Sequence, residues 1–130
     1  MTDNAATWVT AGLMFMGALV FAAFWVTWFR QSHEQPWLPP GYREHETPFV
    51  FSDTALALLL VVAALLLILE EPLGESLSLV AGGMLLFLGI LDAAYFWRTG
   101  LFAPEREGVA NLAIVLAVLA GGMFLIVRYA

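Results

Sequence analysis

The chain has 130 residues, enough for one domain, and its composition is 62% hydrophobic and 12% charged. Water-soluble domains are about half apolar and about a quarter charged, so this composition predicts a protein that lies in the lipid bilayer. The formal net charge is −6, so no basic patch exists to neutralise phosphates, and nucleic acid is excluded as an expected partner.

Cysteine and lysine are both absent, and the five basic residues are all arginines. The absence of cysteine excludes disulfides and thiolate metal sites, and the absence of lysine excludes a Schiff base. The N-terminal segment Met1–Thr7 carries Asp3 and no basic residue, unlike a signal peptide. We therefore expect the first apolar run to remain in the protein as a membrane span.

Four apolar runs follow one another, at about residues 8–29, 49–69, 77–97 and 106–127. Each has about 20 residues, and a helical rise of about 1.5 Å per residue matches them to a hydrocarbon core of about 30 Å. Backbone groups find no partner in lipid, so runs of this length must be helices. The sequence predicts an all-α fold, a four-helix transmembrane bundle with antiparallel neighbours, formed by residues 1–130 as one integral membrane domain.

Proline and glycine mark the expected helix boundaries. Thr47 and Pro48 are typical of an N-cap followed by proline at the first helical position. Pro72 and Gly74 are expected to break the chain between the second and third spans, and Pro104 to begin the fourth.

The only long connection, residues 30–47, is rich in proline, which forbids a regular helix there. Trp37, Leu38 and Tyr42 are suited to the membrane surface. We expect a semi-rigid loop that lies across one end of the bundle.

The arginines predict an orientation. One side holds only Arg128, and the first and third connections hold the other four: Arg30, Arg43, Arg98 and Arg106. By the positive-inside rule these two connections are cytoplasmic. We expect a prokaryotic plasma membrane, with both termini outside and the long loop in the cytoplasm.

A weak internal repeat leaves two interpretations open. Gly12 and the segment 22–24 align at one constant offset with Gly83 and the segment 93–95. Either the chain consists of two tandem helical hairpins, or the alignment of apolar helices is due to chance.

Small residues spaced by four allow close helix packing in lipid. The fourth span has the longest such series, Ala113, Ala117 and Gly121, and the third span has Gly89 and Ala93. These series either pack the monomer or form the seam of a homo-oligomer. The second span is almost entirely Leu, Val and Ala, so we expect it to be the most lipid-exposed helix, with the fourth near the centre.

Asp92 is the most informative residue. It lies five positions before Trp97, about 7–8 Å inside the interface by helix rise. Acids at such depth usually face the bundle interior or a water-filled cavity. Either Asp92 is an ion, proton or polar-ligand site, or it is a structural carboxyl that bonds Tyr95 or another helix or is reached by Arg98 or water.

Asp53 is the N-cap of the second helix if that helix begins at Thr54, but lies inside it if the helix begins at Thr47. The earlier start is favoured because residues 54–69 are too few to span. The candidate polar or ion site then consists of Asp92, Asp53, Asn111 and Tyr95, all on the cytoplasmic side.

His33 and His45 each precede a glutamate on the long loop, and His with a carboxylate can bind a divalent metal. Their spacing matches no helical metal motif, so a polar loop is favoured and we expect no metal or other cofactor.

Phosphate-binding loops, serine elbows and HExxH motifs are missing from the sequence, which argues against an enzyme. We expect a small non-enzymatic accessory or assembly subunit, in a homo-oligomer or a larger membrane complex. The alternative is a channel or transporter for an ion or small polar solute that uses the Asp/Asn cluster. A third interpretation is a membrane enzyme or lipid-binding protein with the aromatic-rich first span as a pocket wall.

Overall fold

The computed structural model describes residues 3–130, so the first two residues of the predicted domain lie outside the described range. Within this range the elements are α1 (Asp3–Arg30), α2 (Tyr42–Glu46), α3 (Phe49–Ile68), α4 (Pro72–Thr99), the 3₁₀ helix η1 (Pro104–Arg106) and α5 (Gly108–Tyr129). The four long helices α1, α3, α4 and α5 are long and apolar enough to cross a membrane. They confirm the predicted all-α, four-helix fold and indicate a membrane location.

The turn between α3 and α4 is shorter than expected. α4 begins at Pro72, which occupies the first helical position after the extended residue Glu71. Gly74 therefore lies inside the helix, and a Cβ atom there would be 2.7 Å from the backbone nitrogen of Leu67. The expectation that Gly74 breaks the chain was wrong, because this glycine lets α4 lie against the end of α3.

The fourth span also begins differently from the prediction. Pro104 starts only the single turn η1, and Glu107 then adopts a left-handed conformation, with a φ of 64°. This conformation ends the turn, so α5 starts at Gly108 and not at Pro104.

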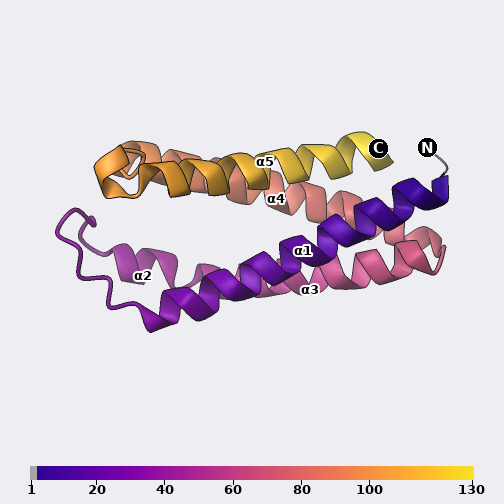
Figure 1. Cartoon of the computed structure of the whole chain (residues 1–130), viewed down its shortest axis with the longest axis horizontal. Helices are drawn as coiled ribbons and strands as arrows, with labels where there is room; N and C mark the ends of the chain where they lie inside the picture. The colour runs from indigo at the N-terminus through magenta and orange to yellow at the C-terminus, as the bar shows by residue number, and fades with distance from the viewer. Residues whose placement is uncertain (1–2) are drawn as a thin grey trace.

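Each long helix packs on the next one in the chain: α1 on α3, α3 on α4, and α4 on α5. Figure 1 shows this order, with the start of α1 and the end of α5 at the same end of the molecule. The arrangement is that of two helical hairpins joined along α3 and α4. Whether they arose from a sequence repeat stays a prediction.

The expected ranking of exposure was wrong, because α3 lies in the middle and α5 at one edge. Leu56, Ala63 and Ala64 on α3 are buried between α1 and α4. Lipid chains are as apolar as leucine, so hydropathy does not separate a lipid-facing face from a helix-facing one.

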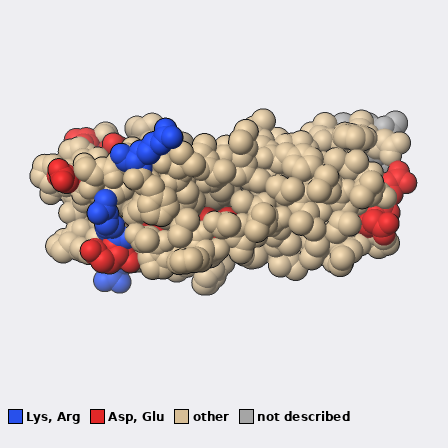
Figure 2. All heavy atoms as spheres, turned by 90° about the horizontal axis from the view of Figure 1, so that it is seen from below, with Lys and Arg blue, Asp and Glu red and all other residues tan. Residues whose placement is uncertain are grey.

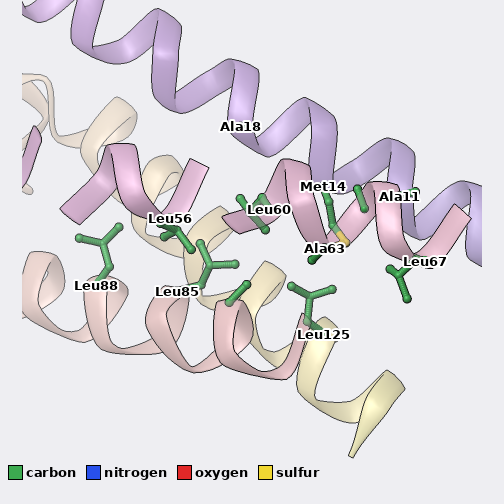
Figure 3. Close-up of a cluster of buried hydrophobic side chains, with 12 residues drawn as sticks. Ala11, Met14, Ala18, Leu56, Leu60, Ala63, Leu67, Leu85, Leu88 and Leu125 are labelled. Atoms are coloured by element: carbon green, nitrogen blue, oxygen red, sulfur yellow. The ribbon is translucent and has the colours of Figure 1, made fainter. Parts of the chain in front are cut away.

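The main apolar core runs along α3, as Figure 3 shows. Met14 of α1 meets Leu60 and Ala63 of α3 on one side, and Leu85 and Leu88 of α4 lie on the other side. This core joins the two hairpins, and it leaves the outward faces of α1 and α5 without such packing.

α4 and α5 cross at a pair of glycines. A Cβ atom on Gly122 would be 2.8 Å from the carbonyl oxygen of Gly82, so neither position admits a larger residue without displacement of the backbone. Gly89 receives Leu119 of α5 in the same interface, as expected from its spacing. Ala113 and Ala117, in contrast, are exposed, so the predicted small-residue series does not pack this monomer.

The long connection lies across one end of α4 and α5, as predicted. The expectation that it contains no helix was wrong for its last part, because its prolines all precede Gly41 and Tyr42–Glu46 can form α2. Trp37 and Leu38 pack on a second cluster formed by Phe96, Leu101 and Val115. The loop thereby covers the end of the bundle at which the polar residues gather.

Candidate functional site

A cavity of about 510 Å³ lies between α1 and α5, with α3 and α4 as its floor. Its α1 wall includes Leu13, Met16 and Val20, each of them at least half exposed. Within residues 3–130 no Cα atom of α1 comes within 8 Å of one in α5, so this side of the bundle is not closed. Figure 1 shows the two helices separating toward the end that carries the long loop.

Two carboxyl groups reach the cavity from α2 and α3. Gly41 starts α2 with a φ of 76°, and α2 leads into α3 with only Thr47 and Pro48 between them. Glu46 and Asp53 are seven residues apart, about two helical turns, so this nearly continuous helix presents both on one face. Both line the cavity and are buried, at 7% and 6% exposure.

Asp53 bridges two helices. Its Oδ2 atom accepts a hydrogen bond of 2.8 Å from the indole Nε1–H of Trp25 on α1. Its Oδ1 atom is buried and has no hydrogen-bond partner among the described residues, and the same holds for Oε1 of Glu46. A buried polar atom without a partner loses its interaction with water, so both oxygens are sites at which a hydrogen-bond donor would be stabilising.

Asp92 of α4 supplies the third carboxyl group of the cavity and is half-buried. It lines the same cavity as Asp53 and Glu46, so the three acids form one cluster around this cavity. Ionised together beside apolar walls, three carboxylates repel one another, and a cation among them would remove that repulsion.

No arginine compensates this cluster. All five arginines belong to the described part of the chain, and none of them lines the cavity. The one ion pair within residues 3–130 joins His45 Nε2 to Glu46 Oε1 at 3.9 Å, and it requires a protonated imidazole. In Figure 2 the basic atoms of the visible face gather at one end, whereas acidic atoms are also visible within the apolar middle.

The other predicted site residues are placed differently. Asn111 lines the cavity, but its Nδ2–H donates a 2.7 Å hydrogen bond to the carbonyl oxygen of Leu101 and so holds the connection before α5. Tyr95 is not part of the lining; its ring stacks on His45 at 3.9 Å between centroids. The structure thus brings together Asp53, Asp92 and Asn111 and places Tyr95 behind them.

The two histidines make different contacts. His33 packs on Trp28, with its Nε2 atom 2.8 Å from the carbonyl oxygen of that residue, whereas His45 lies between Tyr95 and Phe49. Nowhere in residues 3–130 do three or more His, Cys, Asp or Glu side chains converge as they would around a metal ion.

Glu46 was missed in the sequence analysis because it follows a proline-rich loop and was considered only beside His45. The signal that could have found it is its spacing of seven from Asp53, given that the helix of the second span extends back through Pro48. Tyr42, one turn before Glu46 on α2, lines the same cavity for the same reason.

A second hollow, of about 400 Å³, lies on the other side of the contact between α3 and α4. Its lining includes Phe49, Leu56, Phe87 and Leu91, and Asp53 lines it as well. Asp53 is therefore the one carboxyl among the lining residues of both hollows.

The geometry defines a class: a small four-helix membrane protein with an uncompensated acidic cluster in a cavity that is open on one side. Comparisons with family models, curated proteins and solved structures found no match for the chain.

Proposed function

We propose that this chain binds an organic cation in the membrane and carries it, with Glu46, Asp53 and Asp92 as the binding carboxyls. The observation that carries the proposal is the pair of buried, unpartnered oxygens, Oδ1 of Asp53 and Oε1 of Glu46. Both residues line a cavity that no arginine lines, so we take the missing partner to be a positively charged donor from outside the chain that reaches them through this cavity.

The position of Asp53 supports transport in addition to binding. Its carboxyl group is shared by the two hollows on either side of α3 and α4. A small relative movement of the two hairpins would expose a bound cation to one hollow or the other, so the site has two routes of access.

Uptake into liposomes tests the proposal. The purified protein is reconstituted, and the uptake of labelled organic ammonium ions of increasing size is compared with that of protein-free liposomes. The wild type should take up at least one of them faster than protein-free liposomes, and Asp53→Asn should reduce this uptake at least tenfold because the neutral amide no longer attracts a cation.

Glu75→Gln is the matched control, because Glu75 is an exposed carboxyl in the first turn of α4. It should retain wild-type uptake. The proposal fails if no ammonium ion enters faster than without protein, or if Asp53→Asn transports as well as the wild type.

A second candidate function is that of an accessory or assembly subunit. It is favoured by Ala113 and Ala117, a small-residue face of α5 that no other helix of the described chain covers. Purification in mild detergent would then recover a stable protein partner or a homo-oligomer, and a partner-free monomer would contradict it.

We also propose the orientation suggested by the arginines: both termini outside a prokaryotic plasma membrane, and the long loop in the cytoplasm. The support is the positive-inside rule applied to Arg30, Arg43, Arg98 and Arg106. In this orientation the carboxyl cluster lies in the cytoplasmic half of the membrane.

A further inference from the structure

The apolar part of the cavity is larger than an ammonium group requires. Its α1 wall runs from Thr10 to Phe24 and its α5 wall from Asn111 to Leu125. Fourteen helical steps correspond to about 21 Å, most of the thickness of the hydrocarbon core. Apart from Thr10 at the far end, the polar residues that line it lie at the loop end.

The long side of this groove is open to the bilayer. Leu13, Met16 and Val20 of α1 keep half or more of their surface exposed although they face the cavity. In the part of the chain that the structure describes, no residue of α5 closes the groove from the opposite wall. A molecule dissolved in the lipid can therefore enter sideways, without crossing the carboxyl cluster.

The size of the groove distinguishes a small amphiphile from a partner helix. A helix with side chains is about 10–12 Å wide, so a 21 Å length of it occupies roughly 2,000 Å³. The cavity measures about 510 Å³, within the range of about 300–1,000 Å³ usual for small-molecule sites. One extended alkyl chain fits within this space, whereas a transmembrane helix would lie mostly outside it, against the open side.

The carboxyl groups define the other end of the molecule. Oδ1 of Asp53 and Oε1 of Glu46 are acceptors without a donor among the described residues. A primary ammonium group has three N–H donors, whereas a quaternary ammonium group has the same charge and none. A ligand that satisfies both oxygens therefore carries N–H groups as well as positive charge.

We infer that the ligand is a long-chain primary amine, with its ammonium group at Glu46, Asp53 and Asp92 and its alkyl chain in the groove between α1 and α5. This inference rests on the proposed function and names its substrate class. The amine enters from the bilayer, and its ammonium group moves from the lipid interface to the carboxyl groups of the protein.

Equilibrium binding to the protein in lipid nanodiscs tests the inference, with empty nanodiscs subtracted. The probes are dodecylammonium, dodecyltrimethylammonium, dodecanol and ethylammonium. Dodecylammonium should bind once per chain and at least tenfold more tightly than each of the other three. Asp53→Asn or, where that variant does not fold, Glu46→Gln should weaken its binding at least tenfold.

Ala117→Phe tests the groove, because Ala117 lines the cavity and is exposed. The larger side chain should weaken dodecylammonium at least tenfold and leave ethylammonium unchanged. Ala113→Phe is the matched control: Ala113 lies one turn earlier on α5, is also exposed and is not part of the lining. It should bind dodecylammonium as the wild type does.

The outcomes separate the two proposals. If ethylammonium binds as tightly as dodecylammonium, or if Ala117→Phe does not weaken dodecylammonium binding, the proposed cation site is retained. The inference of a long-chain ligand is then wrong. Equal binding of dodecyltrimethylammonium overturns the requirement for N–H donors. If no amine binds, both proposals fail, and binding of a lysine-containing transmembrane peptide alone would assign the groove to a protein partner.

Discussion

Trp25 of α1 donates a hydrogen bond of 2.8 Å to Asp53 of α3. The bond is buried between the two helices and joins residues that are 28 positions apart in the sequence. It is a polar contact in an interface that is otherwise apolar. It also occupies one oxygen of Asp53 and thereby orients the carboxyl group, so that the other oxygen is left for a ligand.

Trp25→Phe should therefore lower both stability and binding. The variant loses the donor and also part of the buried indole, and the hydrogen bond alone contributes about 0.6–1.7 kcal/mol. The free energy of unfolding in mixed micelles should fall by about 1 kcal/mol. Trp97→Phe is the control, since Trp97 is 79% exposed, and an equal loss in both variants would contradict a specific role for the Trp25 bond.

The glycine crossing of α4 and α5 gives a second prediction. Gly122→Ala places a methyl group 2.8 Å from the carbonyl oxygen of Gly82 and 3.0 Å from the backbone nitrogen of Leu86, so the helices must separate. Overpacking of this kind costs about 1–3 kcal/mol, and thermal unfolding in detergent should show it.

Gly83→Ala is the matched control for this crossing, because a Cβ atom on Gly83 meets nothing within 4 Å. Alanine favours the helix by up to about 1 kcal/mol over glycine, so this variant should be as stable as the wild type or more stable. A destabilised Gly83→Ala would show that glycine is needed here for another reason than close packing.

Asn111→Ala should show whether Asn111 holds the connection before α5 in place or binds the ligand. The variant leaves the buried carbonyl group of Leu101 without its side-chain donor, which costs about 1–3 kcal/mol. Hydrogen exchange in residues 101–107 should become faster, whereas uptake of the organic cation should stay near the wild-type level. Leu112→Ala, at an exposed neighbouring position, should change neither, and a tenfold loss of uptake in Asn111→Ala would make Asn111 a ligand-binding residue.

The proposed orientation is testable because the chain has no cysteine of its own. Ser32→Cys and Ser76→Cys place single thiols at exposed positions at opposite ends of the bundle. A thiol reagent that cannot cross the membrane should label intact cells only at position 76. Labelling only at position 32 would reverse the orientation.

The four spans were predictable because the energetic cost of unpaired backbone groups in lipid leaves only helices of this length. Their order in space was not. α3 was expected to face lipid because it consists of Leu, Val and Ala, and yet Leu56 and Ala63 are among its most buried residues. In a membrane, the sequence of a helix at the centre can be as apolar as that of a helix at the edge.

The site was predictable in part for a related reason. Asp53 and Asp92 are conspicuous because a carboxyl group inside an apolar run is costly and rare. Glu46 was missed because its contribution depends on α2, a short helix that starts at the left-handed Gly41 and aligns with α3. Tyr95 does not line the cavity, and its stacking on His45 depends on α2, which was expected to be part of a loop.

The order of helix contacts has a consequence for biosynthesis. Each long helix of residues 3–130 packs on the one that precedes it in the chain, and no contact must wait for a helix made much later. Each span leaving the ribosome therefore meets a partner that is already in the bilayer, and chains rich in such local contacts assemble fast. Because α5 supplies the second wall of the groove, the cavity forms only once α5 has packed on α4 in the bilayer.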